Sequence, residues 1–92
     1  MKYQLSFTTR FKKNVKKLKK RGYNLAAMYE VIELLAKGEQ LDARYHDHPL
    51  HNNLDGYRDC HIEPDWVLIY IKQEQELILT CVQTGTHSDL GL

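Results

Sequence analysis

The sequence has few of the features that mark secreted or membrane proteins. Its 92 residues include only two cysteines and two prolines, and a fold built on disulfides uses more cysteines than this. No apolar run approaches the roughly 20 residues that cross a bilayer, and no apolar run follows the N-terminus as in a signal peptide. These absences predict a reduced, cytosolic protein, away from membranes, with both thiols packed in the sheet.

Internal repeats, low-complexity tails and linkers rich in proline, glycine or serine are also absent. The length allows one domain, residues 1–92. The net charge of +1 hides an asymmetry, because residues 1–46 hold 11 Lys/Arg against 4 Asp/Glu, whereas residues 47–92 hold 2 against 8. All five histidines lie from His46 onward. A basic first half and an acidic, histidine-rich second half indicate separate roles.

The apolar periodicity predicts a strand and two helices in the first half. Residues 2–6 alternate and are expected to form a short strand. The next segment repeats apolar residues at helical spacing and is ended by Gly22. A second helix begins after Asn24 and is ended by Gly38. Because their connection is short, the two helices are expected to form an antiparallel hairpin.

The second half is expected to be a sheet. Residues 39–53 are polar and irregular, and the period then becomes two, which predicts strands at 54–62, 66–72 and 76–83. The connections are short enough for hairpins. The prediction is therefore an α+β fold of order β-α-α-β-β-β, a small antiparallel, partly mixed sheet with the helix hairpin on one face. The other face stays available for function.

The first predicted helix is strongly basic. No acidic residue lies between Arg10 and Arg21. The basic residues of this segment are Arg10, Lys12, Lys13, Lys16, Lys17, Lys19, Lys20 and Arg21. One interpretation is an ordinary solvated helix face. Like charges three and four residues apart repel, however, so a purely structural helix would normally include glutamates. The pattern favours contact with the phosphates of a nucleic acid.

The histidines allow three interpretations. His46 and His48 flank Asp47, with His51 three residues further on, but no cysteine pair or His-Glu-x-x-His helix supports a zinc site, so no metal is expected. A second interpretation, which we expect to hold for His46 and His51, is that they are exposed loop residues without a role. The third is general acid–base catalysis, because imidazole titrates near neutral pH.

The strand at 54–62 places one histidine on the open face of the sheet. Tyr57, Asp59 and His61 share a face, and Cys60 and Ile62 point to the other, which the helices should cover. A protonatable group on an open face near a phosphate-attracting helix indicates cleavage of RNA. In that chemistry a 2′-hydroxyl attacks its own 3′-phosphate, helped by a base, an acid and a cation.

Three sequence blocks carry a resemblance to a known family. They are YHDHPL at 45–50, GYRDCHIEPDWVLIY at 56–70 and TGTHSDL at 84–90. Together with the basic helix hairpin before them, they resemble the YafQ branch of the RelE/ParE superfamily, which contains the toxins of bacterial type II toxin–antitoxin modules. The resemblance covers essentially the whole chain.

The resemblance implies a RelE-like fold and a ribosome-dependent endoribonuclease. Such a toxin enters the ribosomal A site and cuts messenger RNA by 2′-hydroxyl attack, which inhibits translation without a cofactor. The family's catalytic residues correspond to His48, His61, Asp65 and His87. We expect His87 to be the general acid, His48 and Asp65 to act as base or positioning groups, and His61 to orient or bind the phosphate. The neighbouring Trp66 is expected to pack partly in the core.

The sequence departs from the family at Gln83, where the family usually has an arginine that would stabilise the phosphorane. An uncharged amide there predicts either a slow, attenuated enzyme or a substitute cation such as Arg58, which the predicted helix-covered face makes an unfavourable choice. The chain end also lacks the family's aromatic residue. The expected contacts to RNA or the ribosome are Lys12, Lys13, Lys16, Lys17, Lys19, Lys20, Arg21, Tyr57 and Gln83.

The resemblance also implies partners. These are the ribosome, messenger RNA and a small acidic antitoxin similar to DinJ, whose DNA-binding part would bring the complex to operator DNA. An alternative from the same superfamily is a non-enzymatic ParE-like toxin that binds DNA gyrase. Gln83 favours that alternative, and the retained histidines oppose it. A free, ribosome-independent ribonuclease is a further alternative, although groups for holding RNA alone are sparse.

Overall fold

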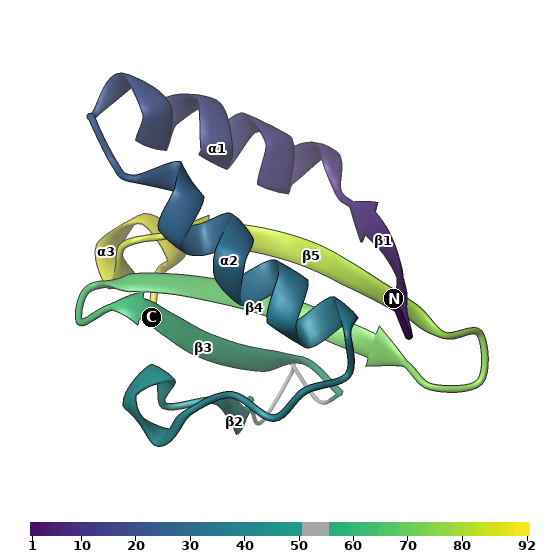
Figure 1. Cartoon of the computed structure of the whole chain (residues 1–92). Helices are drawn as coiled ribbons and strands as arrows, with labels where there is room; N and C mark the ends of the chain where they lie inside the picture. Colours follow the sequence, from purple (N-terminus) through teal and green to yellow (C-terminus); the bar gives the residue numbers. More distant parts are fainter. Residues whose placement is uncertain (51–55) are drawn as a thin grey trace.

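The computed structural model, drawn in Figure 1, describes residues 1–50 and 56–92. The bounds of its elements, in chain order, are β1 Gln4–Phe7, α1 Thr9–Lys20, α2 Leu25–Ala36, the 3₁₀ turn η1 Ala43–Tyr45, β2 His48–Pro49, β3 Arg58–Glu63, β4 Trp66–Gln73, β5 Ile78–Gly85 and α3 His87–Leu90. No helix in the described part of the chain is long and apolar enough to cross a membrane.

One five-stranded sheet has the order β1-β5-β4-β3-β2. β1 runs parallel to β5 and every other neighbouring pair is antiparallel. α1 and α2 run in opposite directions across the same face, with α1 against β5 and α2 against β3 (Figure 1). The predicted α+β fold, the helix hairpin and the mixed sheet are confirmed.

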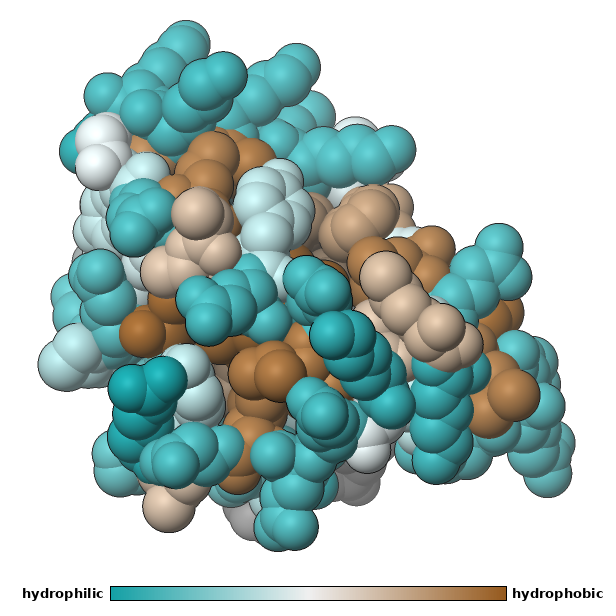
Figure 2. Space-filling model, viewed as in Figure 1, coloured by the Kyte–Doolittle hydropathy of each residue, from teal (hydrophilic) through white to brown (hydrophobic). Residues whose placement is uncertain are grey.

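The core lies between the helices and the sheet. α1 buries Phe11 and Leu18, and the Thr8 hydroxyl caps this helix by accepting from the Phe11 backbone N–H at 3.0 Å. On the sheet, Trp66 is fully buried, and its indole N–H donates to the Thr84 hydroxyl at 2.9 Å. Trp66 is therefore a core residue, as expected. Figure 2 shows that hydrophilic side chains gather on the outer side of α1.

Several predicted limits were wrong. The first strand covers Gln4–Phe7 rather than 2–6, because its register is set by pairing with β5. β5 begins at Ile78 rather than 76, because Leu77 has a left-handed backbone (φ 55°) that belongs to the turn. β3 begins at Arg58 within the described residues. The predicted strand start at 54 and the loop position of His51 lie outside the described residues.

A β-bulge in β5 decides which face Gln83 occupies. Cys81 pairs with Tyr70, but Gln83 pairs with Ile69, so Val82 is an extra residue in the ladder. Simple alternation would have put Gln83 on the helix-covered face with Cys81. The bulge instead puts Gln83 on the opposite face, in one cross-strand row with Ile69 and Asp59.

Candidate active site

Four imidazoles meet at one edge of the sheet and form what we call the imidazole cluster. The ring centroid of His61, on β3, lies 5.6 Å from that of His46, 6.4 Å from that of His48 and 5.3 Å from that of His87. Pairing of β2 with β3 sets His48 opposite Asp59, which shares a face with His61. The sheet thereby brings together groups that lie far apart in the sequence.

His87 is fixed by the turn between β3 and β4. Its Nδ1 donates to Asp65 Oδ1 at 2.6 Å, and its backbone N–H donates to the same oxygen at 3.1 Å. These two hydrogen bonds hold the pKa of the Asp65 carboxyl below its usual value. Because the carboxylate accepts from Nδ1, the other ring nitrogen, Nε2, is the one left to exchange a proton with a substrate.

The short helix α3 holds His87 at its first position. Thr86 and Asp89 form a reciprocal capping box, in which the Thr86 hydroxyl accepts from the Asp89 backbone and the Asp89 carboxylate accepts from the Thr86 backbone. Arg21, at the end of α1, pairs with Asp89 at 2.9 Å. The basic helix is thus joined to the element that carries His87.

His48 is fixed in a similar way through its Nδ1 atom. That nitrogen lies 2.8 Å from the His46 carbonyl oxygen and 2.9 Å from Asp59 Oδ1. A single N–H cannot point at both, and it is directed at the carbonyl. Asp59 Oδ1 therefore has no hydrogen-bond donor among the described residues, although an imidazole is adjacent. Here too, Nε2 is left for the substrate.

Asp59 is a buried carboxyl in this site. Only 4% of the residue is exposed. Burial raises the pKa of the Asp59 carboxyl, and the opposing attraction of His48, His61 and His87 does not cancel that effect. A carboxyl kept away from water beside three imidazoles is the kind of arrangement found at functional sites.

The loop that carries His46 and His48 is anchored from its other side by Asp47. Asp47 Oδ1 accepts from the Tyr70 hydroxyl at 2.6 Å and from Arg58 Nε at 3.3 Å. Tyr70 is fully buried, so this anchor is tied to the core. Arg58 is engaged there, opposite Tyr70 in the sheet, which supports the expectation that it does not substitute for a cation at Gln83.

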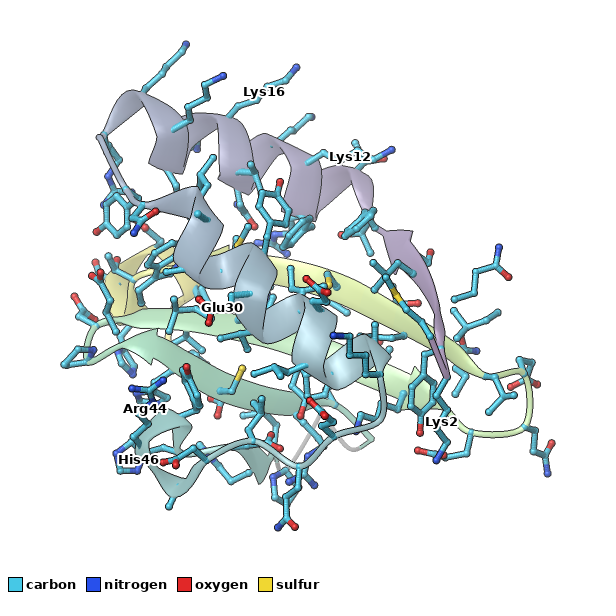
Figure 3. The ribbon with its side chains drawn as sticks, in the orientation of Figure 1. Lys2, Lys12, Lys16, Glu30, Arg44 and His46 are labelled. Carbon is cyan, nitrogen blue, oxygen red and sulfur yellow. The ribbon has the colours of Figure 1, made fainter. Side chains whose placement is uncertain are left out.

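A cleft of about 760 Å³ opens beside the cluster. It lies between α2, η1 and the end of β3, and Glu30, Arg44 and His46 can be followed in Figure 3. Its lining residues are Ala27, Glu30, Arg44, Tyr45, His46, His48, His61, Ile62, Glu63 and Pro64. Arg44 is the one lysine or arginine among these described lining residues.

The structure brings the four predicted catalytic residues together, since His48, His61 and His87 are neighbours and Asp65 holds His87. His46 is exposed and lies between η1 and β2, as expected, but it is close to the site. Its ring packs edge-on against His61, and its backbone is left-handed (φ 49°), which turns the chain toward β2.

Strand pairing, rather than the sequence motifs, puts two further residues on the face of the sheet that carries His61. Asp59 was missed as a site residue, although alternation with His61 was the available signal. Gln83 lies on the same face, and its Oε1 is buried without a hydrogen-bond partner among the described residues. Tyr57, half-buried, precedes β3 and donates no side-chain hydrogen bond within the described part of the chain.

The basic helix presents its lysines to solvent. Lys12, Lys13, Lys16, Lys17, Lys19 and Lys20 are all exposed, and Figure 3 shows Lys12 and Lys16 pointing away from the sheet. None of these six takes part in an ion pair among the residues that the structure describes. Arg21 differs, because Asp89 already neutralises it.

Comparison with known proteins identifies the family. The YafQ family, bacterial toxins of type II toxin–antitoxin systems, matches residues 3–91. The chain belongs to the YafQ toxin family. The mRNA interferase toxin YafQ of Escherichia coli K12 is 37% identical over 87 residues, which cover 94% of this chain and 92% of the relative. The toxin of the same name in strain BL21-DE3 is 38% identical with the same coverage.

Solved structures agree with this membership of the YafQ family. YafQ from E. coli BL21(DE3) superposes with a TM-score of 0.89 at 36% identity, covering 96% of this chain and 97% of that one. YafQ in the E. coli DinJ–YafQ complex gives 0.88 at 37% identity with the same coverage. A metal-bound toxin from Helicobacter pylori gives 0.90 at 38% identity, covering 96% and 98%.

Proposed function

We propose that this YafQ-family toxin, acting as a single domain, is a ribosome-dependent endoribonuclease that cuts messenger RNA. The observation that carries the proposal is the imidazole cluster, in which His48 and His87 each have Nδ1 occupied by an acceptor and make no hydrogen bond through Nε2 to a described residue. The names of the E. coli relatives, mRNA interferase toxins, support the same activity.

The geometry supports a division of proton transfers. Nε2 of His48 removes the proton of a ribose 2′-hydroxyl, and that oxygen then attacks the adjacent phosphorus. The bond from phosphorus to the 5′-oxygen breaks, and Nε2 of His87 delivers a proton to the leaving oxygen. The products are a 2′,3′-cyclic phosphate and a 5′-hydroxyl. Each such proton transfer contributes about 10²–10⁴-fold to the rate.

The remaining site residues bind and position. His61 lies next to both His48 and His87 and is proposed to contact the phosphate oxygens. Asp65 holds the His87 ring through the 2.6 Å hydrogen bond. Gln83 can donate only an uncharged hydrogen bond to the phosphorane, so we propose that the site is slower than one with arginine there.

The exposed lysines of α1 support binding to the ribosome. Six ammonium groups on one helix, none paired with a carboxylate of the described residues, attract phosphates and release counterions. The resulting affinity depends on salt and not on sequence. The cleft is open to solvent, and the ribosome would present the messenger RNA to it. Because translating ribosomes are the proposed target, the proposal locates the protein in the bacterial cytoplasm.

An acidic antitoxin is the proposed partner. The E. coli relative crystallises as a DinJ–YafQ complex, and a DinJ-like chain would complement the positive charge of α1. We propose that such a complex binds operator DNA through the antitoxin. The antitoxin would also stabilise the toxin by mass action, because it binds the folded state alone.

Primer extension on a reporter messenger RNA tests the function. The unmodified chain and its Gln83→Arg variant are induced in bacteria, and cut positions are mapped against the reading frame. Codon-phased cuts from the unmodified chain are expected, with more frequent cuts from the arginine variant. Growth arrest without cuts in either strain would instead favour a toxin that acts by binding a protein such as DNA gyrase.

A further inference from the structure

We propose that the outer part of the cleft is a nucleobase subsite that selects guanine beside the cut. It rests on the proposed function, because it names the base that the same active site reads. Glu30 on α2 and Arg44 on η1 are proposed to read the edge of the base. Neither residue belongs to the catalytic set, and neither stood out in the sequence.

The shape of the cleft supports a planar ligand. Its volume of about 760 Å³ falls within the roughly 300–1,000 Å³ typical of small-molecule sites. Ala27, Ile62 and Pro64 contribute apolar surface, and His61 lies at the same cleft. A base held here belongs to a nucleotide whose phosphate lies at the imidazoles, so the subsite and the reaction share one substrate.

Arg44 is held in place for hydrogen bonding. Its guanidinium carbon lies 4.7 Å from the centroid of the Tyr45 ring, and one of its Nη atoms donates to the Tyr45 hydroxyl at 2.7 Å. Stacking on a half-buried aromatic ring restricts the guanidinium and leaves its other N–H groups to bind a ligand. A pre-oriented arginine fork matches the two acceptors of guanine, O6 and N7.

Glu30 supplies the complementary acceptor. It lines the same cleft as Arg44, yet no ion pair joins these two residues, or Glu30 to any other described residue. Glu33, on the same helix, is instead paired with Lys37 at 3.3 Å. A carboxylate and a guanidinium that line one cleft without pairing leave room for a ligand that carries both donors and acceptors.

Guanine fits this pair of groups better than the other bases. Its N1–H and N2–H groups donate to a carboxylate, while O6 and N7 accept from an arginine. Adenine and cytosine offer an amino group to Glu30 but no second donor beside it. Uracil offers one ring N–H, and the carbonyl oxygens on both sides of it are repelled by a carboxylate.

Nucleotide titration of the isotope-labelled full chain, followed by NMR, tests the subsite directly. The probes are the 5′-monophosphates of guanosine, adenosine, cytidine and uridine. GMP is expected to bind more tightly than the other three and to shift the backbone signals of Ala27 and Tyr45. Glu30→Gln is expected to weaken GMP binding by about tenfold, within the discrimination expected for one bidentate contact. Glu33→Gln, the matched control on the same helix, should leave it unchanged.

Equal affinity for the four nucleotides, or an unchanged GMP affinity in Glu30→Gln, would overturn the proposal. Cleavage of a message library randomised at the nucleotides flanking the cut separates it from the proposed function. Codon-phased cuts without a guanine preference would overturn the subsite and leave the nuclease intact. GMP binding in the cleft without any cleavage would support the subsite and reject the nuclease.

Discussion

The two faces of the sheet differ in what they bury. The helix-covered face buries Trp66, Leu68 and Tyr70 with no exposed surface, and the one indole N–H is paired. The opposite face buries Oδ1 of Asp59 and Oε1 of Gln83. Neither oxygen accepts a hydrogen bond from a described residue. An unpaired buried polar atom costs about 1–3 kcal/mol.

This difference shows where the molecule gains stability and where it loses some. The same strands supply both faces, since residues along a strand alternate between them. Burial on the core face raises the pKa of the Cys60 and Cys81 thiols, which keeps both protonated and unreactive. The opposite face, which carries His61 and Asp59, keeps titratable groups close together. This lowers the free energy of unfolding, and burial on the helix-covered face compensates for the loss.

The largest expected effect is loss of activity without loss of stability. His87→Ala removes the proposed general acid and should lower cleavage of ribosome-bound message by about 10²–10⁴-fold. Its melting temperature should stay near that of the parent, because the His87 side chain is 39% exposed and does not belong to the hydrophobic core. Rates in a translating extract and thermal unfolding measure both effects. Ser88→Ala, at the next position in α3, is the control, and full activity in His87→Ala would remove the assignment.

The reverse effect is expected on the core face. Leu68→Ala leaves a cavity in the fully buried core and should lower the free energy of unfolding by about 2–5 kcal/mol. Urea unfolding measures the loss. At a temperature where the variant is still folded, its cleavage rate should match that of the parent. A large fall in rate for the folded variant would show that the two faces are not separable.

Tyr70→Phe tests the contact that links the two faces. It removes the hydroxyl that donates to Asp47 at 2.6 Å, so the loop that carries His48 is held at Asp47 by the longer Arg58 contact of 3.3 Å. Small displacements of a catalytic group cost up to about 10²-fold, and we expect a loss of about tenfold in cleavage with a modest fall in stability. Tyr29→Phe, at an exposed position, is the control. Unchanged cleavage in Tyr70→Phe would show that Asp47 does not position the loop.

The smallest effect, and the one of opposite sign, is expected at Asp59. Burial raises the pKa of this carboxyl above its ordinary value of 3.8. Below that ordinary value both folded and unfolded chains are protonated, and the penalty appears as pH rises through the folded-state pKa. Asp59→Asn should therefore melt a few degrees higher at neutral pH, with the gain vanishing toward pH of about 4. Cleavage should fall because an uncharged amide replaces the carboxylate beside His48. A lower melting temperature at neutral pH would contradict the assignment.

The fold followed from local pattern, whereas parts of the site followed from pairing between distant strands. Helical spacing and the limits at Gly22 and Gly38 predicted the helices, and short connections predicted that the last three strands pair as hairpins. Alternation put His61 on the open face. The two-residue strand β2 contains Pro49 and has no periodic signal, so the approach of His46 to the cluster was not predictable.

The position of Gln83 was hidden for a related reason. The bulge at Val82 is a feature of the pairing between β4 and β5, and the alternation of residues within β5 alone does not reveal it. The four-residue helix α3 is likewise only about one turn long, so its sequence shows no repeat of apolar residues at helical spacing. Its capping pair, Thr86 and Asp89, was its only local signal.

The central claim is that His48 and His87 cut RNA through its own 2′-hydroxyl on the ribosome. The most direct measurement is the chemical end group left on message cut in a reconstituted translation reaction with the unmodified chain. The claim predicts a 2′,3′-cyclic phosphate on the upstream fragment and a 5′-hydroxyl on the downstream fragment, with ribosomes present and not with RNA alone. A 3′-hydroxyl with a 5′-phosphate, or equal cutting of free RNA, would contradict it.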